Sequence, residues 1–170
     1  MKLSDKTRRL LETSANIGIV VVTLAILWNF IWPRIHPKRQ ASDPVVGSSV
    51  SLGGVDWNKN GSTLLMVLQE GCKYCEQSVP FYKSLHAQRS GSQPRMLTVV
   101  PGEAASVTRY LSEQGVPTDG IINASLSDVN VSGTPTLLLV DNTGHIKNVW
   151  VGKLDANREK EVMQKAFGIP

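Results

Sequence analysis

Apolar runs of two kinds alternate along the chain from residue 62 onward. Residues 62–68 form an almost continuous apolar run, which is typical of a strand buried on both faces of a sheet. Residues 76–88 instead carry apolar side chains every three or four positions, which predicts an amphipathic helix, and the breakers at residues 90–94 end it. Residues 96–100 have the composition of a second buried strand. The pattern predicts a strand–helix–strand unit.

The C-terminal part of the chain predicts two strands followed by a helix. Residues 131–140 form an apolar strand with a proline near its start, and residues 145–151 alternate as a half-buried strand. Asp-Asn-Thr-Gly at residues 141–144 is a turn signal between them. Asp155 is a suitable N-cap for a last helix that runs to about residue 167.

The remaining stretches complete an α/β pattern. Residues 104–114 predict a helix, whereas residues 120–131 fit either a helix or a strand. Short apolar stretches at residues 50–52 and 55–57 predict an added N-terminal strand or hairpin. The order from residue 62 is therefore strand–helix–strand, a variable helical connection, and strand–strand–helix, which is an α/β fold.

A separate apolar segment precedes this domain. Residues 15–32 carry no charge and end in several aromatic side chains. At about 1.5 Å per residue, this length reaches across a bilayer, and the aromatic end resembles an interfacial belt. We therefore expect a cytoplasmic tail at residues 1–14, a transmembrane anchor at 15–32, a linker at 33–47 and one domain at 48–170.

The distribution of charge agrees with this organisation. Residues 1–40 hold seven Lys/Arg and two Asp/Glu, whereas residues 41–170 hold eleven and twelve, so the domain is nearly neutral and gives no support for a nucleic-acid partner. Four basic residues precede the anchor and three follow it, which favours a cytoplasmic N-terminus. A cleaved signal peptide is the alternative, but residues 33–40 offer no small-residue cleavage site.

Cys72 and Cys75 are the only cysteines of the chain. Their spacing places both on the first turn of the predicted helix, at the carboxyl end of a strand, where open α/β sheets hold their sites. A helix N-terminus stabilises a thiolate, and a second thiol one turn away can resolve a mixed disulfide. The pair therefore predicts a dithiol–disulfide redox centre.

Metal binding is the alternative chemistry for this cysteine pair. Structural zinc usually needs four Cys or His ligands, and the chain adds only His36, His86 and His145, with His36 in the linker. Cu(I) accepts two soft thiolates at low coordination, so a copper carrier stays open as an alternative. We predict a site without a bound metal.

These features together resemble the thioredoxin superfamily, most closely its membrane-anchored TlpA/ResA-like branch. The shared features are Cys-Lys-Tyr-Cys at the start of a helix, Pro80 eight positions after the first cysteine, and Gly-Thr-Pro-Thr at residues 133–136. The resemblance covers roughly residues 48–168. It implies a thioredoxin-like fold with a mixed sheet flanked by helices, and a cis proline beside the disulfide.

The chain departs from that family at positions that tune the chemistry. Thioredoxins carry a buried acid six residues before the first cysteine, where this chain has Met66, so the proton acceptor for Cys75 is unassigned. Gly71 stands where many members carry a tryptophan. Tyr74 and Thr134 resemble the oxidising and isomerising members, so the direction of electron flow stays open.

We predict a membrane-tethered thiol–disulfide oxidoreductase that reduces or exchanges disulfides of extracytoplasmic proteins. The expected site residues are Cys72 as nucleophile, Cys75 as resolving thiol, Thr134 and Pro135 in the cis-proline loop, and Lys73, Tyr74 and Gly133 as substrate contacts. The redox-active disulfide serves without a further cofactor. Expected partners are protein thiols and disulfides and a membrane redox partner, with the domain on the periplasmic side of the inner membrane. A disulfide oxidase or isomerase, a Cu(I) carrier and a redox-inert adaptor are the alternatives.

Overall fold

The structure, a computed structural model, describes most of the C-terminal domain and part of the N-terminal segment. The chain divides into two units, residues 1–40 and 41–170. The described residues are 16–28, 31, 44–89, 91 and 94–169, with only the backbone of Asn60.

The first unit contains a helix over residues 16–28. Among the residues that the structure describes, no helix is both long enough and apolar enough to cross a membrane, so the predicted anchor is not confirmed. The parts of the N-terminal prediction outside the described residues are Ala15, Asn29, Phe30 and Trp32 of the anchor, the tail at 1–14 and residues 33–43 of the linker.

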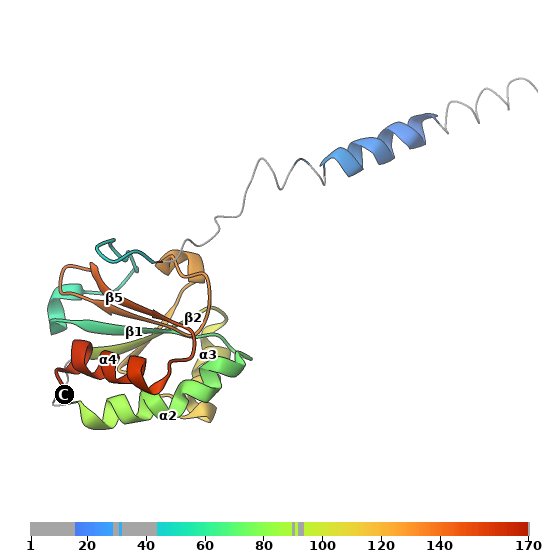
Figure 1. The fold of residues 1–170 in the computed structure, drawn as a ribbon. Helices are drawn as coiled ribbons and strands as arrows, with labels where there is room; N and C mark the ends of the chain where they lie inside the picture. Colours follow the sequence, from blue (N-terminus) through green and yellow to red (C-terminus); the bar gives the residue numbers. More distant parts are fainter. Residues whose placement is uncertain (1–15, 29–30, 32–43, 90, 92–93, 170) are drawn as a thin grey trace, which may run out of the picture. The chain divides into compact units, whose positions relative to one another are not determined.

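The second unit is built on a five-stranded mixed sheet with the order β3-β2-β1-β4-β5 (Figure 1). β1, β2 and β3 run parallel, whereas β4 is antiparallel to β1 and β5 is antiparallel to β4. The elements are β1 (Thr63–Val67), α2 (Lys73–Gln88), β2 (Arg95–Val100), α3 (Ala104–Gln114), β3 (Gly120–Asn123), β4 (Thr136–Val140), β5 (Ile146–Val151), α4 (Ala156–Phe167) and the 3-10 helices η1 (Trp57–Asn60) and η2 (Leu126–Val129). The mixed sheet confirms the predicted fold class.

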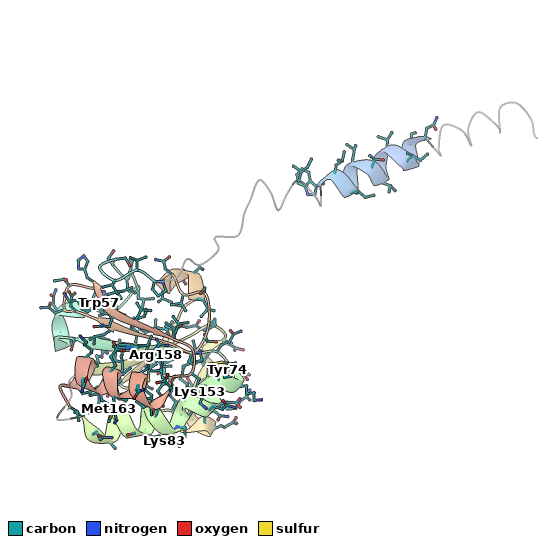
Figure 2. All side chains as sticks on the ribbon, in the orientation of Figure 1. Trp57, Tyr74, Lys83, Lys153, Arg158 and Met163 are labelled. Carbon is teal, nitrogen blue, oxygen red and sulfur yellow. A yellow bond between two sulfur atoms is a disulfide. The ribbon has the colours of Figure 1, made fainter. Side chains whose placement is uncertain are left out.

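The helices α2, α3 and α4 pack on one face of this sheet (Figure 1). Val79, Tyr110 and Val162, one from each helix, belong to the same buried cluster as Met66 of β1. The opposite face is covered by irregular chain, including the short helices η1 and η2. Figure 2 shows Trp57 of η1 on the side of the sheet away from Met163 of α4. The domain therefore has a helical layer and a thinner layer of turns.

β1 is the central strand, and all of its residues are buried, which explains its continuous apolar run. Its last residue, Val67, pairs with Thr136, the first residue of β4. The chain leaves β1 at this end and enters α2 a few residues later. The sheet register therefore places the start of α2 beside the loop that precedes β4.

The strand predicted over residues 131–140 is shorter in the structure and begins only at Thr136. Pro135 has no N–H group to donate to a sheet, and residues 133–135 bend before it. Val131 is nevertheless buried. Its apolar character therefore reflects packing beneath a loop rather than membership of the strand.

The N-terminal strand or hairpin predicted over residues 50–57 is wrong. The chain in this region makes one isolated bridge, between Ser49 and His145, and then forms η1, whose first turn Asp56 caps. Val50 and Leu52 are both buried against the face of the sheet opposite the helices. The alternation that suggested a strand thus comes from burial of every second side chain without strand pairing.

The other helix predictions are confirmed. α3 has the predicted bounds, and α4 follows Asp155, whose carboxylate accepts hydrogen bonds from the N–H groups of Asn157 and Arg158. α2 contains Pro80 in its interior. The ambiguous residues 120–131 hold both a short edge strand, β3, and the single turn η2.

Candidate active site

The two cysteines lie at the start of α2. Cys72 is the N-cap residue and Cys75 lies in the first turn, with their Cα atoms 5.2 Å apart and their sulfur atoms joined in a disulfide. The Cys75 N–H donates a hydrogen bond to the Cys72 sulfur at 3.2 Å. Gly71, at φ +72°, adopts the left-handed backbone that the turn into α2 requires. Cys72 is half-buried and Cys75 fully buried, so Cys72 is the more accessible sulfur.

The loop before β4 forms the second part of the site. The Thr134–Pro135 peptide bond is cis, and the Thr134 carbonyl oxygen lies 3.5 Å from the Cys72 sulfur. The Thr136 hydroxyl donates a hydrogen bond to the Gly133 carbonyl oxygen at 2.8 Å, which holds the loop against the start of β4. The predicted loop residues and the predicted nucleophile are therefore brought together.

Lys73 and Tyr74, which separate the cysteines in sequence, are both exposed. Tyr74 is 58 % exposed, and its carbonyl oxygen accepts a hydrogen bond from the Ser78 hydroxyl at 2.8 Å. Figure 2 shows Tyr74 at the end of α2 that carries the cysteines, with Lys83 further along the same helix. A large aromatic side chain exposed beside the disulfide is available for contact with a partner.

The β1 side of Cys75 is apolar. Met66 is fully buried in the same cluster as Cys75, at the position where thioredoxins carry an acid. The nearest acids in sequence, Glu70 and Glu76, are exposed instead. The Glu70 carboxylate accepts a hydrogen bond from the Ser106 hydroxyl of α3 at 3.1 Å. The carboxylates therefore lie at the surface near the motif rather than beneath it.

Tyr110 of α3 is a polar residue of this region that sequence reasoning missed. It is 6 % exposed, and its hydroxyl group has no hydrogen-bond partner among the described residues. Burial raises the pKa of Tyr110, and the negative charges of Glu76 and Glu70 raise it further. The sequence carries no signal for this placement, because α3 lies in a connection whose packing no motif predicts.

The histidines lie apart from one another and have partners near them in sequence. Within the described part of the chain, no group of three or more His, Cys, Asp or Glu side chains could hold a metal ion. His86 contacts Arg89 at the end of α2, and His145 contacts Thr143 after the β4–β5 turn. A metal at the cysteine pair would need ligands from outside the described residues besides the two sulfur atoms.

Three solved structures share the architecture described above. No family model and no curated protein matches this chain. A thiol-disulfide isomerase from Corynebacterium glutamicum is 17% identical with a TM-score of 0.55, covering 75% of this chain and 96% of its own. The thioredoxin domain of a thiol-disulfide oxidoreductase from Bacteroides vulgatus is 15% identical with a TM-score of 0.55, covering 72% and 98%. StoA from Bacillus subtilis is 22% identical with a TM-score of 0.51, covering 71% and 97%.

These identities are low, so the similarity lies in the fold. The domain has the thioredoxin-like fold of thiol–disulfide isomerases and oxidoreductases, and it carries a disulfide between Cys72 and Cys75 at the start of α2.

Proposed function

We propose that this protein is a thiol–disulfide oxidoreductase whose redox centre is the Cys72–Cys75 pair. One observation carries the proposal: the half-buried Cys72 sulfur at the N-terminus of α2 lies 3.5 Å from the Thr134 carbonyl oxygen. A reactive sulfur beside a loop of exposed backbone groups suits an extended peptide, which can align with the loop while its own disulfide meets Cys72.

In the reductive direction, the Cys72 thiolate attacks one sulfur of a substrate disulfide, and the other substrate sulfur leaves as a thiolate that takes a proton from water. The N-terminus of α2 and the Cys75 N–H, which lies 3.2 Å from the Cys72 sulfur, stabilise the attacking thiolate. Cys75 then loses its proton and attacks Cys72, which releases the second substrate thiol and closes the disulfide. Two electrons pass to the substrate, and a redox partner must return them to the protein.

The proposed substrate contacts surround Cys72. Lys73 and Tyr74 are exposed on the first turn of α2, and Gly133 and Thr134 offer backbone groups in the facing loop. A neutral domain with an exposed aromatic side chain at the site suits protein thiols and disulfides as substrates. A disulfide oxidase or isomerase would use the same residues, and Tyr74 and Thr134 are the features that favour this alternative.

The cellular setting belongs to the same proposal. Residues 15–32 anchor the protein in the inner membrane by one crossing, and the domain faces the periplasm. The uncharged length of this segment and the basic residues on both sides support the assignment. A membrane protein that exchanges thiols would then be the partner that re-reduces Cys72 and Cys75.

Disulfide exchange by the purified full-length protein tests the proposed function. The reduced protein should reduce a peptide disulfide, and Cys72→Ser should abolish this activity. Equilibration with dithiol buffers gives the direction: a potential near about −270 mV marks a reductant, and one near about −120 mV marks an oxidant. A wild-type rate in Cys72→Ser would overturn the proposal. Absence of a reversible disulfide, with stoichiometric Cu(I) binding lost in Cys72→Ala, would favour the copper carrier.

A further inference from the structure

The resolving step of the proposed reaction poses a problem of proton transfer. Cys75 is fully buried, and burial in an apolar environment favours the protonated thiol. Met66 fills the place on β1 from which an acid could accept that proton, and it carries no titratable group. A thiol that water cannot reach needs another polar group to conduct its proton to the surface.

Tyr110 is the buried polar group of the helical layer that has no other assignment. Its side chain belongs to the same packed cluster as Cys75, with Cys72 packed against the edge of that cluster. Its hydroxyl group is buried and has no hydrogen-bond partner within the described residues. An unpartnered buried hydroxyl costs free energy, so a functional reason for retaining it is expected.

Two carboxylates stand beside the Tyr110 hydroxyl. Ser106 and Tyr110 are four residues apart on α3 and so share one helix face, and Ser106 holds the Glu70 carboxylate by a hydrogen bond of 3.1 Å. Glu76 directly follows Cys75 on α2. Glu76 and Glu70 both raise the pKa of Tyr110, after burial, which places their negative charges within electrostatic reach of its hydroxyl group.

The other elements around this cluster add few charges. On α2, Tyr82 is buried with a hydrogen bond to Ser78, and it interacts electrostatically with Tyr110 and with Glu159 of α4. Burial raises the pKa of Tyr82 as well, so this side chain stays neutral. Glu70 and Glu76 are therefore the acidic groups that act on Tyr110, and both have access to water.

We propose that the Tyr110 hydroxyl conducts the proton of Cys75 to the exposed carboxylates of Glu76 and Glu70 during the resolving step. This inference rests on the proposed oxidoreductase function and adds a residue to it. The Cys75 thiol gives its proton to the Tyr110 oxygen as the Tyr110 proton passes to a carboxylate, from which water removes it. The Cys75 thiolate then attacks the Cys72 sulfur, and the bond between Cys72 and the substrate breaks.

Rapid mixing of the reduced full-length protein with 5,5′-dithiobis(2-nitrobenzoate) separates the two steps. The first thionitrobenzoate is released when Cys72 attacks the reagent, at a rate proportional to reagent concentration. The second is released when Cys75 resolves the mixed disulfide, at a rate independent of that concentration. Tyr110→Phe should leave the first phase unchanged and slow the second about 100-fold at neutral pH, the usual contribution of a positioned proton acceptor.

The pH profile of the second phase distinguishes proton transfer from a structural effect. With the route lost, resolution depends on hydroxide, so its rate in Tyr110→Phe should rise about tenfold per pH unit, more steeply than in the wild type. Glu70→Gln combined with Glu76→Gln should change the profile in the same direction. Tyr82→Phe is the matched control, because it removes another buried phenol hydroxyl of the same cluster and should leave the profile unchanged.

The outcomes separate this inference from the proposed function. If Tyr110→Phe resolves the mixed disulfide with the wild-type rate and pH profile, the proton route is wrong while the oxidoreductase function stands. An equal change in Tyr82→Phe would also overturn the route, because it would indicate altered packing. If the wild-type protein releases no second thionitrobenzoate, the proposed function itself fails.

Discussion

The Cys72 sulfur and the Thr134 carbonyl oxygen lie 3.5 Å apart, although 62 residues separate them in the chain. The sheet produces this closeness: Val67 at the end of β1 pairs with Thr136 at the start of β4, and the two residues lead directly to the cysteines and to the loop. A shift of one residue in this pairing would invert the side chains of β4. The candidate site therefore depends on the β1–β4 register as much as on the cysteine motif.

Cys75→Ser should convert the protein into a trap for its substrates. The half-buried Cys72 can still attack a substrate disulfide, but no second thiol remains to resolve the mixed disulfide. Non-reducing electrophoresis and mass spectrometry should therefore detect a covalent complex that a dithiol releases. Cys72→Ser should form no such complex, because the remaining sulfur of Cys75 is fully buried. Equal trapping by both variants would reverse the assignment of the two cysteines.

Tyr74→Ala should weaken the reaction with protein substrates without harming the fold. Tyr74 is 58 % exposed, so truncation should change the free energy of unfolding by less than about 0.5 kcal/mol. Loss of one aromatic contact, worth about 1 kcal/mol, should lower kcat/KM for a protein disulfide about fivefold. The rate with a small aromatic disulfide should change much less, because such a reagent reaches only the sulfur.

Ile121→Ala serves as the control for Tyr74→Ala. Ile121 is also a large exposed apolar side chain, at 40 % exposure, but it lies on the edge strand β3. Its truncation should leave kcat/KM for the same protein substrate unchanged. An equal loss in both variants would mean that general surface hydrophobicity, rather than contact at Tyr74, accounts for the effect.

The sequence predicted the parts of the fold in which burial follows a simple period. β1 reads as a strand because both of its faces are covered, and α4 reads as a helix because Asp155 caps it and Val162 faces the core. The stretch around Val50 and Leu52 misled because irregular chain can also bury alternate side chains. Periodicity thus reports burial directly and backbone pairing only indirectly.

The candidate site was predictable in part for a related reason. Cys72 and Cys75 announce themselves by their spacing, and the resemblance supplied the loop around Pro135. Tyr110 carries no local signal, because its importance depends on α3 packing over α2 and on Ser106 reaching Glu70. Contacts between elements joined by a connection of variable length follow from tertiary packing, which one sequence does not specify at the level of single residues.

Asp119→Asn should destabilise the domain in a pH-dependent manner. Arg89 donates two hydrogen bonds to the Asp119 carboxylate, one of them 2.7 Å long, and the carboxylate also accepts the Met96 N–H at 2.8 Å. The hydrogen bond from Arg89 is the main reason why the pKa of Asp119 lies below its usual value. Replacing a partly buried charged acceptor by a neutral amide should lower the free energy of unfolding by about 1–2 kcal/mol at pH 7.

The sign of the pH dependence follows from this lowered pKa. The ionised Asp119 contributes its full stability above the pKa of an unfolded aspartate, about 3.9, and loses it as the pH falls through the lower pKa of the folded state. The difference between the wild type and Asp119→Asn should be constant from pH 6 to 8 and shrink below about pH 4. Urea denaturation at several pH values measures it, with the exposed Glu113→Gln as control. A difference that grows in acid would contradict this account.

Two buried threonines should respond in opposite ways to removal of their hydroxyl groups. Thr98 on β2 is fully buried, and its hydroxyl oxygen has no hydrogen-bond partner within the described chain. Thr136 on β4 is equally buried, but its hydroxyl holds the Gly133 carbonyl oxygen at 2.8 Å. Thr98→Val should therefore raise the free energy of unfolding by up to about 1 kcal/mol, whereas Thr136→Val should lower it by about 1 kcal/mol.

The same pair of variants tests how closely the loop is coupled to the chemistry. Loss of the hydrogen bond to Gly133 frees the loop whose Thr134 carbonyl oxygen lies beside the Cys72 sulfur. Thr136→Val should therefore slow the first, reagent-dependent attack by Cys72 on a protein disulfide, while Thr98→Val should leave it unchanged. Thermal unfolding and exchange rates on the same preparations compare the two effects. If both variants stabilise the domain and react at the wild-type rate, the Thr136–Gly133 hydrogen bond contributes neither to folding nor to the loop.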